Sequence, residues 1–382
     1  MRLYVVMMSM TSFYAVSGYL LNMKGEMKAS SKKSKVFFKR GNLSDFLKTP
    51  QKILDGVKKS GLSSQIEKDE FVGLKVHFGE KGNLSHINPK ILTSLVKFLK
   101  KRGSRPFFWD TNTLYRGRRM HAVDHINLAD SHGFAQFGVP IIIGDGIKGN
   151  DYIEARINQK HFQICYLASA LKDIDCLIVL SHLTGHMLTG FGAAVKNLGM
   201  GCAAKRGKLL QHCLVSPKIN KEKCIGCGLC SQHCCVDAIE KENSKYFIIE
   251  EKCIGCAQCI SVCPKEAVTI VWSENYNVLG EKMVEYAYAV ARKRKCFYIN
   301  FCLYITKECD CMNREKSPFI DDIGILFSAD PVSIDKASLD LVIDCQKRDA
   351  IGEIHPQIDY LSSLQYAQEI GLGNLEYKLI EI

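Results

Sequence analysis

Eight cysteines in the middle of this 382-residue chain have the type and spacing to hold iron–sulfur clusters. They form two copies of the pattern C-x2-C-x2-C-x3-C, which begin at Cys224 and Cys253. Three thiolates at this pitch surround one cubane, and the fourth, after the longer gap, reaches the other cluster. The doubled pattern therefore predicts two 4Fe–4S clusters and one-electron transfer. The predicted ligands are Cys224, Cys227, Cys230 and Cys263 for the first cluster, and Cys253, Cys256, Cys259 and Cys234 for the second.

Other uses of cysteine fit this pattern poorly. A zinc site pairs two C-x2-C units and has no use for a third cysteine at the same pitch. A disulfide framework is typical of short secreted chains. One irregularity is that Pro264 follows the second copy, whereas Cys235 takes the equivalent place in the first. The spacing selects Cys234 as the ligand and leaves Cys235 as a spare thiol that could compete with it.

Strand-like and helix-like segments alternate on both sides of the cysteine segment. Apolar runs typical of buried strands occupy residues 71–76, 106–109, 139–143, 176–180, 296–301 and 322–328. Helical patterns occupy a segment from Pro89 that Gly103 stops, a segment through Val123, Ile126 and Ala129, then 281–292, a segment from Asp330, and 356–370. This alternation predicts an α/β fold with a mainly parallel sheet and covering helices, interrupted by a small α+β insert of ferredoxin type.

The chain divides into four segments on this interpretation. Residues 1–35 form an apolar extension and a polar linker, 36–216 the first part of the α/β domain, 217–271 the two-cluster insert, and 272–382 the second part. The extension contains several serines and is a poor membrane span, so we expect a cytoplasmic protein, with a weak signal or anchor as the alternative. Ten further cysteines beside oxygen-sensitive clusters favour an anaerobic or strongly reducing compartment.

Polar residues follow the predicted strands, at the edge where open parallel sheets bind ligands. His77, Asp110 and His182 are the candidates for proton transfer. His182 and His186 are four residues apart, a spacing that could hold a further metal on a helix, although Gly185 between them favours a loop. Loops also carry polar residues without a function, which is the alternative interpretation.

A glycine-rich stretch and a cysteine pair are further candidates. Gly190, Gly192, Lys196 and Asn197 could bind an anionic substrate or cofactor through backbone N–H groups and the lysine charge. The alternative is a tight connection in which only glycine fits. The pair C-x-C at Cys309 and Cys311 could be a metal site, a redox-active dithiol or two thiols in a loop.

Several stretches together resemble a named family over nearly the whole chain from about Val36. They are Lys75–Glu80, Trp109–Tyr115, Ala122–His125, Ile143–Gly146, Leu180–Cys202, Asn300–Phe301, Cys309–Cys311, Asp322–Val332 and Ile370–Gly373. The sequence resembles the domain-of-unknown-function family 362, whose members are often called iron–sulfur center proteins. The resemblance implies no agreed activity. The apolar N-terminus and Cys235 depart from the family pattern.

Three functions compete at this point. The first is an iron–sulfur oxidoreductase that passes low-potential electrons to an α/β site for an anionic small molecule. The others are a non-enzymatic ferredoxin-like carrier and a protein that matures a metal centre. A redox partner protein is expected. Nucleic acid is not, because the formal net charge of +11 comes without a basic stripe interleaved with aromatic residues.

Overall fold

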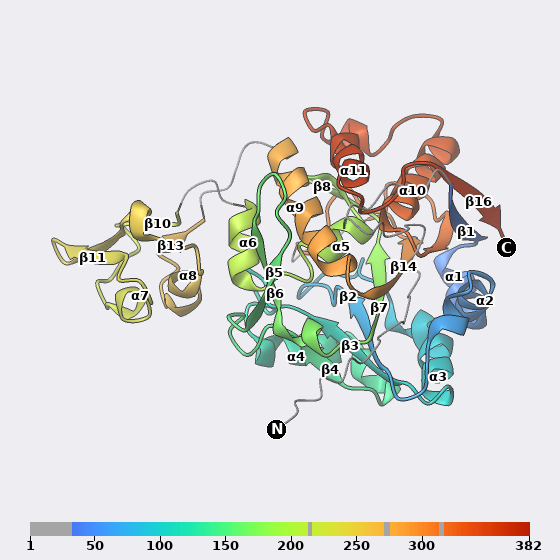
Figure 1. Ribbon diagram of the computed structural model, residues 1–382, viewed down its shortest axis with the longest axis horizontal. Helices are drawn as coiled ribbons and strands as arrows, with labels where there is room; N and C mark the ends of the chain where they lie inside the picture. Colours follow the sequence, from blue (N-terminus) through green and yellow to red (C-terminus); the bar gives the residue numbers. More distant parts are fainter. Residues whose placement is uncertain (1–32, 116, 213–215, 271–275, 313–316) are drawn as a thin grey trace, which may run out of the picture.

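The computed structural model describes residues 33–115, 117–212, 216–270, 276–312 and 317–382 (Figure 1). The predicted N-terminal extension and most of its linker, residues 1–32, lie outside the described residues. Within the described part, no helix has the length and apolar content needed to cross a membrane.

The α/β part is built on one eight-stranded sheet among the described residues, with the order β16-β1-β15-β14-β7-β2-β3-β4. Five of its seven strand pairs are parallel, and only β15 runs against its neighbours. The mainly parallel α/β sheet predicted from the sequence is confirmed. In chain order the strands are β1 (Ser34–Arg40), β2 (Phe71–Val76), β3 (Arg105–Asp110), β4 (Ile141–Ile143), β7 (Cys176–His182), β14 (Lys295–Cys302), β15 (Gly324–Ser328) and β16 (Tyr377–Glu381).

Helices cover both faces of the sheet (Figure 1). Strand β7 is apolar on both faces, with Leu177 and Val179 in one core cluster and Ile178 and Leu180 in the other. Burial of each such side chain contributes roughly 1.5–3 kcal/mol, which is why parallel strands read as continuous apolar runs. One face carries α2 (Gln51–Lys59) and α3 (Thr93–Lys101), and the other carries α5 (Ala194–Gly199), α9 (Tyr276–Ala291), α10 (Pro331–Gln346) and α11 (Tyr360–Glu369). Shorter elements are α1 (Leu43–Lys48), β5 (Tyr152–Arg156), β6 (Ile164–Ala168), β8 (Thr184–His186) and β9 (Gly190–Gly192).

The helix α4 (Ala122–Ser131) forms where predicted but buries a different face. Val123 and Ile126 are 62% and 38% exposed, so only Ala129 of the predicted apolar face is buried. The buried face includes His125, which lies 3.6 Å from the Asp110 carboxylate. The helix thus buries Ala122, His125, Leu128 and Ala129, a face that includes a histidine and that apolar periodicity alone does not identify.

The cysteine segment lies in the connection between neighbouring strands β7 and β14, after α6 (Lys205–His212) and before α9. Residues 216–270 fold into two short helices, α7 (Leu229–Gln232) and α8 (Gln258–Val262), with two small two-stranded sheets. These sheets pair β10 (Lys218–Ile219) with β13 (Val268–Thr269), and β11 (Ile239–Glu242) with β12 (Lys245–Ile248). In Figure 1 the segment stands at one side of the α/β part, with α8 nearer to it than α7 and β11.

Candidate functional site

Two small cavities in residues 216–270 are each lined by four cysteines. One is lined by Cys224, Cys227, Cys230 and Cys263. The other is lined by Cys234, Cys253, Cys256 and Cys259. The structure thus brings together the two sets of cysteines that the spacing predicts, and the last cysteine of each copy lies at the cavity of the other copy.

The two copies share a backbone conformation as well as a sequence pattern. Positions 29 residues apart have the same left-handed φ: Gly226 and Gly255 at 69° and 67°, Gly228 and Ala257 at 80° and 63°, Asp237 and Glu266 at 49° and 52°. Three of these six residues are not glycine and would rarely adopt this conformation without a reason. The repeat therefore extends to the turns that aim the cysteines into the cavities.

Hydrogen bonds orient the crossing cysteines. The sulfur atoms of Cys234 and Cys263 each accept the backbone N–H four residues further on, at 3.2 Å. Such bonds fix a ligand thiolate and tune the centre that it holds. The spare thiol, Cys235, is exposed and lies outside both cavities, although it is within hydrogen-bonding reach of Cys256.

The cysteine segment contacts the α/β part through α8. Ala257, beside this helix, packs with Leu114 and Leu209, and Ser261 accepts a 3.0 Å hydrogen bond from Lys205. The cavity lined by Cys253, Cys256 and Cys259 therefore belongs to the side of the segment that faces the sheet. Leu114 also lines the large cavity of the α/β part, so one layer of apolar side chains separates that cavity from the cysteine segment.

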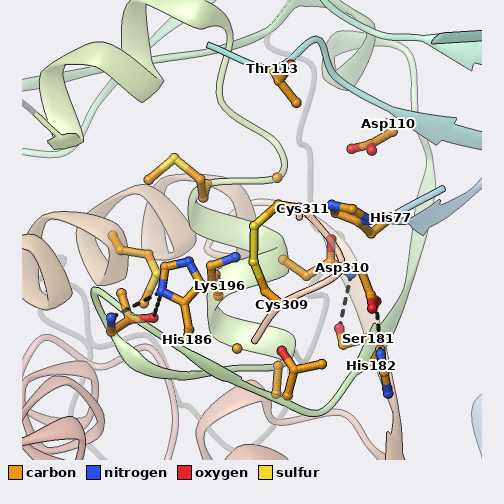
Figure 2. A pocket seen from close by; sticks show the side chains of 18 of the residues that line it. His77, Asp110, Thr113, Ser181, His182, His186, Lys196, Cys309, Asp310 and Cys311 are labelled. Carbon is orange, nitrogen blue, oxygen red and sulfur yellow. Dashed lines mark hydrogen bonds and ion pairs between the residues drawn. A yellow bond between two sulfur atoms is a disulfide. The ribbon is translucent and has the colours of Figure 1, made fainter. Parts of the chain in front are cut away.

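A cavity of about 600 Å³ lies beyond the carboxyl ends of β2, β3 and β7 (Figure 2). His77 directly follows β2, Asp110 ends β3, and His182 ends β7, so all three predicted proton-transfer residues line it. Gly192, Lys196 and Asn197 also line it, whereas Gly190 does not. Parallel strands bring their carboxyl ends to the same edge, which explains why residues so distant in sequence meet here.

Asp110 is a buried, paired anion. Its carboxylate lies 2.8 Å from Lys75 Nζ, and both side chains are less than 5% exposed. Burial by itself would raise the pKa of Asp110, but the charge of Lys75, with His125, holds it well below its usual range. A carboxylate this firmly ionised does not take up a proton near neutral pH, which argues against the predicted proton transfer by Asp110. Its role in this geometry is to neutralise Lys75.

His182 is held as an imidazolium. Nδ1 lies 2.9 Å from the Asp310 carboxylate, and Nε2 lies 2.8 Å from the backbone oxygen of Leu303. Both partners can only accept, so both ring nitrogens carry a proton. Burial would lower the pKa of His182, but Asp310 outweighs it and raises this pKa. Both protons are engaged within the protein, which favours a structural role for His182 over the predicted proton transfer.

His77 is the predicted proton-transfer residue that best fits a role toward a ligand. Its Nδ1 accepts the backbone N–H of Gly79 at 3.0 Å, which places the proton of the neutral ring on Nε2. Burial and then the nearby Arg119 charge hold the pKa of His77 well below its usual range. A neutral ring of fixed tautomer can donate a hydrogen bond to an anion in the cavity.

The glycine-rich stretch does not form an anion cradle. The N–H groups of Ala194 and Val195, at the start of α5, bind the buried carboxylate of Asp335 at 2.8 and 2.9 Å. Gly190 has φ +75°, and a Cβ there would lie 2.6 Å from the Tyr360 side chain. These contacts favour the alternative interpretation, a tight connection in which glycine is required by packing.

Of the four residues predicted to bind an anion, Lys196 is the one that the geometry leaves available for that role. Asn197 accepts a 2.7 Å hydrogen bond from Lys75 and donates to the backbone oxygen of Leu180, so its polar atoms are engaged. Lys196 has no hydrogen bond or ion pair with another described residue. Burial, followed by repulsion from Arg119, lowers the pKa of Lys196 to about 8. An anion bound beside it would favour its charged form.

The C-x-C pair also lies in the cavity wall. Cys309 and Cys311 form a disulfide, and the His186 ring and both sulfur atoms lie within 4.8 Å of one another. The loop that carries the pair approaches β8 closely, since a Cβ on Gly185 would collide with the backbone oxygen of Lys307. His182 and His186 lie on separate strands, so they do not share a helix face as the metal interpretation would require.

Several cavity residues were not singled out from the sequence. They are Lys75, Arg119, Lys208 and Asp310, each buried and charged. The sequence could have identified Asp310 as a site residue, since it lies between two candidate cysteines. It gave weaker evidence for Lys75, because a lysine in an otherwise apolar strand needs a buried partner. Nothing local to Arg119 or Lys208 indicated burial.

Comparisons with known proteins place the chain in a family. Residues 72–340 match the family described as a domain of unknown function, DUF362. No curated protein matches the chain. Solved structures that are distantly similar include a protein from Thermotoga maritima and the lactate racemase apoprotein from Thermoanaerobacterium thermosaccharolyticum.

Both structural similarities are weak. The first covers 78% of this chain and 59% of the Thermotoga protein, with 10% identity and a TM-score of 0.41. The second covers 71% of this chain and 50% of the racemase, with 12% identity and a TM-score of 0.40. This chain therefore spans less than two thirds of either protein, and similarities this distant do not bear on function. The family match spans more than half of the chain, so the protein belongs to the DUF362 family.

Proposed function

We propose that this protein is an iron–sulfur electron-transfer protein that binds two 4Fe–4S clusters in its two cysteine-lined cavities. The observation that carries the proposal is the structural repeat, in which each cavity gathers three cysteines of one copy and the last of the other. Four thiolates are the ligand set that a cubane requires. The clusters would supply reversible one-electron transfer, and the chain would supply the ligands, the turns and the N–H···S bonds.

The two cavities differ in their surroundings, which supports a direction for electron flow. Ile225, beside the cavity of Cys224, is 59% exposed, whereas the equivalent Ile254 is 38% exposed. The cavity next to Ile254 lies on the side that contacts α6 and Leu114. We therefore assign the exposed end to contact with a redox partner protein and the covered end to the α/β cavity.

The large cavity supports an oxidoreductase that acts on an anionic small molecule. Its lining includes the cations Lys75, Arg119, Lys196 and Lys208 and the His182 imidazolium, against two carboxylates, Asp110 and Asp310. Asp110 is matched by Lys75, Asp310 by His182, and Arg119 by the buried carboxylate of Glu80, which leaves Lys196 and Lys208. The remaining charge is positive, and a volume of about 600 Å³ suits a small molecule or cofactor. A simple electron carrier has no need of such a cavity.

Iron analysis tests the proposal directly. Protein prepared without oxygen is expected to contain about eight irons and eight sulfides per chain, as two cubanes require. Reduction is expected to give an electron paramagnetic resonance spectrum with the broadening of two interacting clusters. A content of four irons or fewer with no interaction signal would refute the ligand assignment, and zinc in place of iron would refute the electron-transfer role.

The anionic ligand leads to a prediction for Lys196. Its amine is expected to titrate near pH 8, and sulfate at constant ionic strength should raise this pKa by favouring the charged form. Nuclear magnetic resonance of ¹³C-methylated lysines measures the shift, and Lys196→Gln identifies the signal by its loss. Lys205 is a matched control, because its pKa is also lowered to about 8 but its amine faces Ser261. Equal shifts at both lysines, or none at Lys196, would contradict an anion site here.

A further inference from the structure

The Cys309–Cys311 pair is built into the cavity wall rather than left in an unsupported loop. Asp310, between the two cysteines, pairs with His182 and accepts a 2.7 Å hydrogen bond from the Ser85 hydroxyl. The pair is thus anchored at its centre while both cysteines line the cavity. In Figure 2 the disulfide lies among His77, Lys196 and His186. A disulfide that only braced the fold would not need to face a cavity that accepts a ligand.

Two neighbouring side chains suit thiol chemistry. His186 Nδ1 lies 3.2 Å from the backbone N–H groups of Leu188 and Thr189 and 2.9 Å from the Thr189 hydroxyl, which itself donates to the backbone oxygen of Phe191. These contacts hold the imidazole ring in place beside the disulfide. The ring lies within 4.8 Å of the sulfur atoms, where it can protonate a departing thiolate. Lys196 lines the same wall and can stabilise the remaining thiolate by its charge.

From this arrangement we infer that Cys309 and Cys311 are a redox-active dithiol pair that serves the cavity. Reduction breaks the S–S bond, and two electrons and two protons convert the disulfide into two thiols. His186 gives one proton and is reprotonated from solvent, and the second comes from solvent through the cavity. Reoxidation forms the S–S bond again and passes two electrons and two protons to the reducible anionic small molecule that the cavity is proposed to bind, which is the two-electron acceptor. The electron source, by chemical class, is a low-potential one-electron donor.

This inference rests on the proposed function for its source of electrons. A disulfide needs two electrons, whereas a cubane carries one. Two clusters on one chain match that requirement. The first electron leaves one thiolate and one thiyl sulfur, and a second electron stored on the same chain reduces the thiyl sulfur before it reacts elsewhere. The pair would thus convert single electrons into a two-electron reductant at the cavity.

Thiol trapping tests the pair without any assay of activity. The whole protein is treated with dithiothreitol under native, anaerobic conditions, freed of it, alkylated with iodoacetamide and analysed by peptide mass spectrometry. We expect a gain of two labelled thiols, Cys309 and Cys311, which oxidised dithiothreitol reverses. Exposed Cys345 should be labelled in both states. Labelling that appears only after denaturation would make the disulfide structural, and full labelling before reduction would make the residues ordinary thiols.

Variants test the two neighbouring residues. His186→Gln is expected to slow reduction by roughly a hundredfold, the low end of what a positioned general acid contributes. Lys196→Gln should move the pH profile of thiol labelling to higher pH, because the thiolate loses its cation. His132→Gln, at a half-buried histidine outside the cavity lining, should change neither. Unchanged rates and pH profiles in both cavity variants would overturn these roles.

Protection of the reduced thiols by one equivalent of Zn²⁺ before any reoxidation would assign the pair to metal binding instead.

A second arm separates this inference from the proposed function. Dithionite replaces dithiothreitol, and the whole protein is compared with the Cys227→Ala/Cys256→Ala variant, which lacks one ligand of each predicted cluster. Both proteins should gain two thiols with dithiothreitol, but only the iron-loaded protein should gain them with dithionite. A gain with dithiothreitol in both, and with dithionite in neither, supports the dithiol pair and refutes its connection to the clusters. No gain with dithiothreitol in either protein overturns the dithiol pair itself.

Discussion

The double variant Cys234→Ala/Cys256→Ala is expected to retain about four irons per chain, while Cys234→Ala/Cys227→Ala loses nearly all of them. Cys234 and Cys256 line the same cavity, so the first variant damages one predicted cluster twice. Cys227 lines the other cavity, so the second variant damages both. Four thiolates hold each cubane, and a cavity that lacks one of them should lose its cluster on purification. Iron and acid-labile sulfide analysis provides the measurement.

This comparison is sharp because it separates the predicted crossed ligation from ligation within one copy of the pattern. Cys234 belongs to the same copy of the pattern as Cys227, so ligation within one copy would reverse the two iron contents. A matched control is Cys235→Ala, which changes the exposed neighbouring thiol and should leave about eight irons. If Cys235→Ala instead lost four irons and Cys234→Ala lost none, the spare thiol would be the ligand.

The α/β framework was predictable because its strands are buried on both faces. The segment 71–76 was predicted with the bounds that β2 has, and 176–180 lies within β7. The edge strand β16 and its neighbour β1 were not predicted, because their exposed charged residues interrupt the apolar pattern. The direction of a strand could not be predicted from its apolar pattern either, since nothing in the composition of β15 distinguishes an antiparallel strand from a parallel one.

The location of the candidate site could be predicted from the sequence, but the chemical role of each of its residues could not. The carboxyl ends of three strands located His77, Asp110 and His182 at one cavity. Their protonation depends on partners far away in sequence, such as Asp310, which lies 128 residues from His182. The same holds for Asp335, which occupies the start of α5 from 140 residues away. The spacing of residues in the sequence indicates only local geometry. Partners that are distant in sequence determine which polar groups remain available to bind a ligand or transfer a proton.

The buried pair of Lys75 and Asp110 leads to the largest expected change in stability. Lys75→Met is expected to lower the free energy of unfolding by about 3–5 kcal/mol, because it leaves a carboxylate buried without its main partner. Lys75→Met/Asp110→Asn should recover part of this loss, since the charge is then removed as well. Denaturant unfolding of the iron-loaded protein, followed by far-ultraviolet circular dichroism, gives the comparison. Lys336→Met is the control, because its half-exposed pair with Asp340 should contribute less than about 1 kcal/mol.

The pH dependence of stability should change sign in Lys75→Met. In the native protein the pKa of Asp110 is held below its ordinary value of 3.8, so its contribution is present above that pH and is lost as the pH falls. Without Lys75, burial becomes the dominant influence and raises the pKa of Asp110. The contribution of Asp110 to stability is then greatest at low pH and is lost as the pH rises through the new pKa, by up to about 1.4 kcal/mol per pH unit. A variant whose loss is the same at pH 5 and pH 8, or no larger than that of Lys336→Met, would show that other groups neutralise Asp110. His125 and Arg119, at 3.6 and 4.0 Å from its carboxylate, would then be the residues to change next.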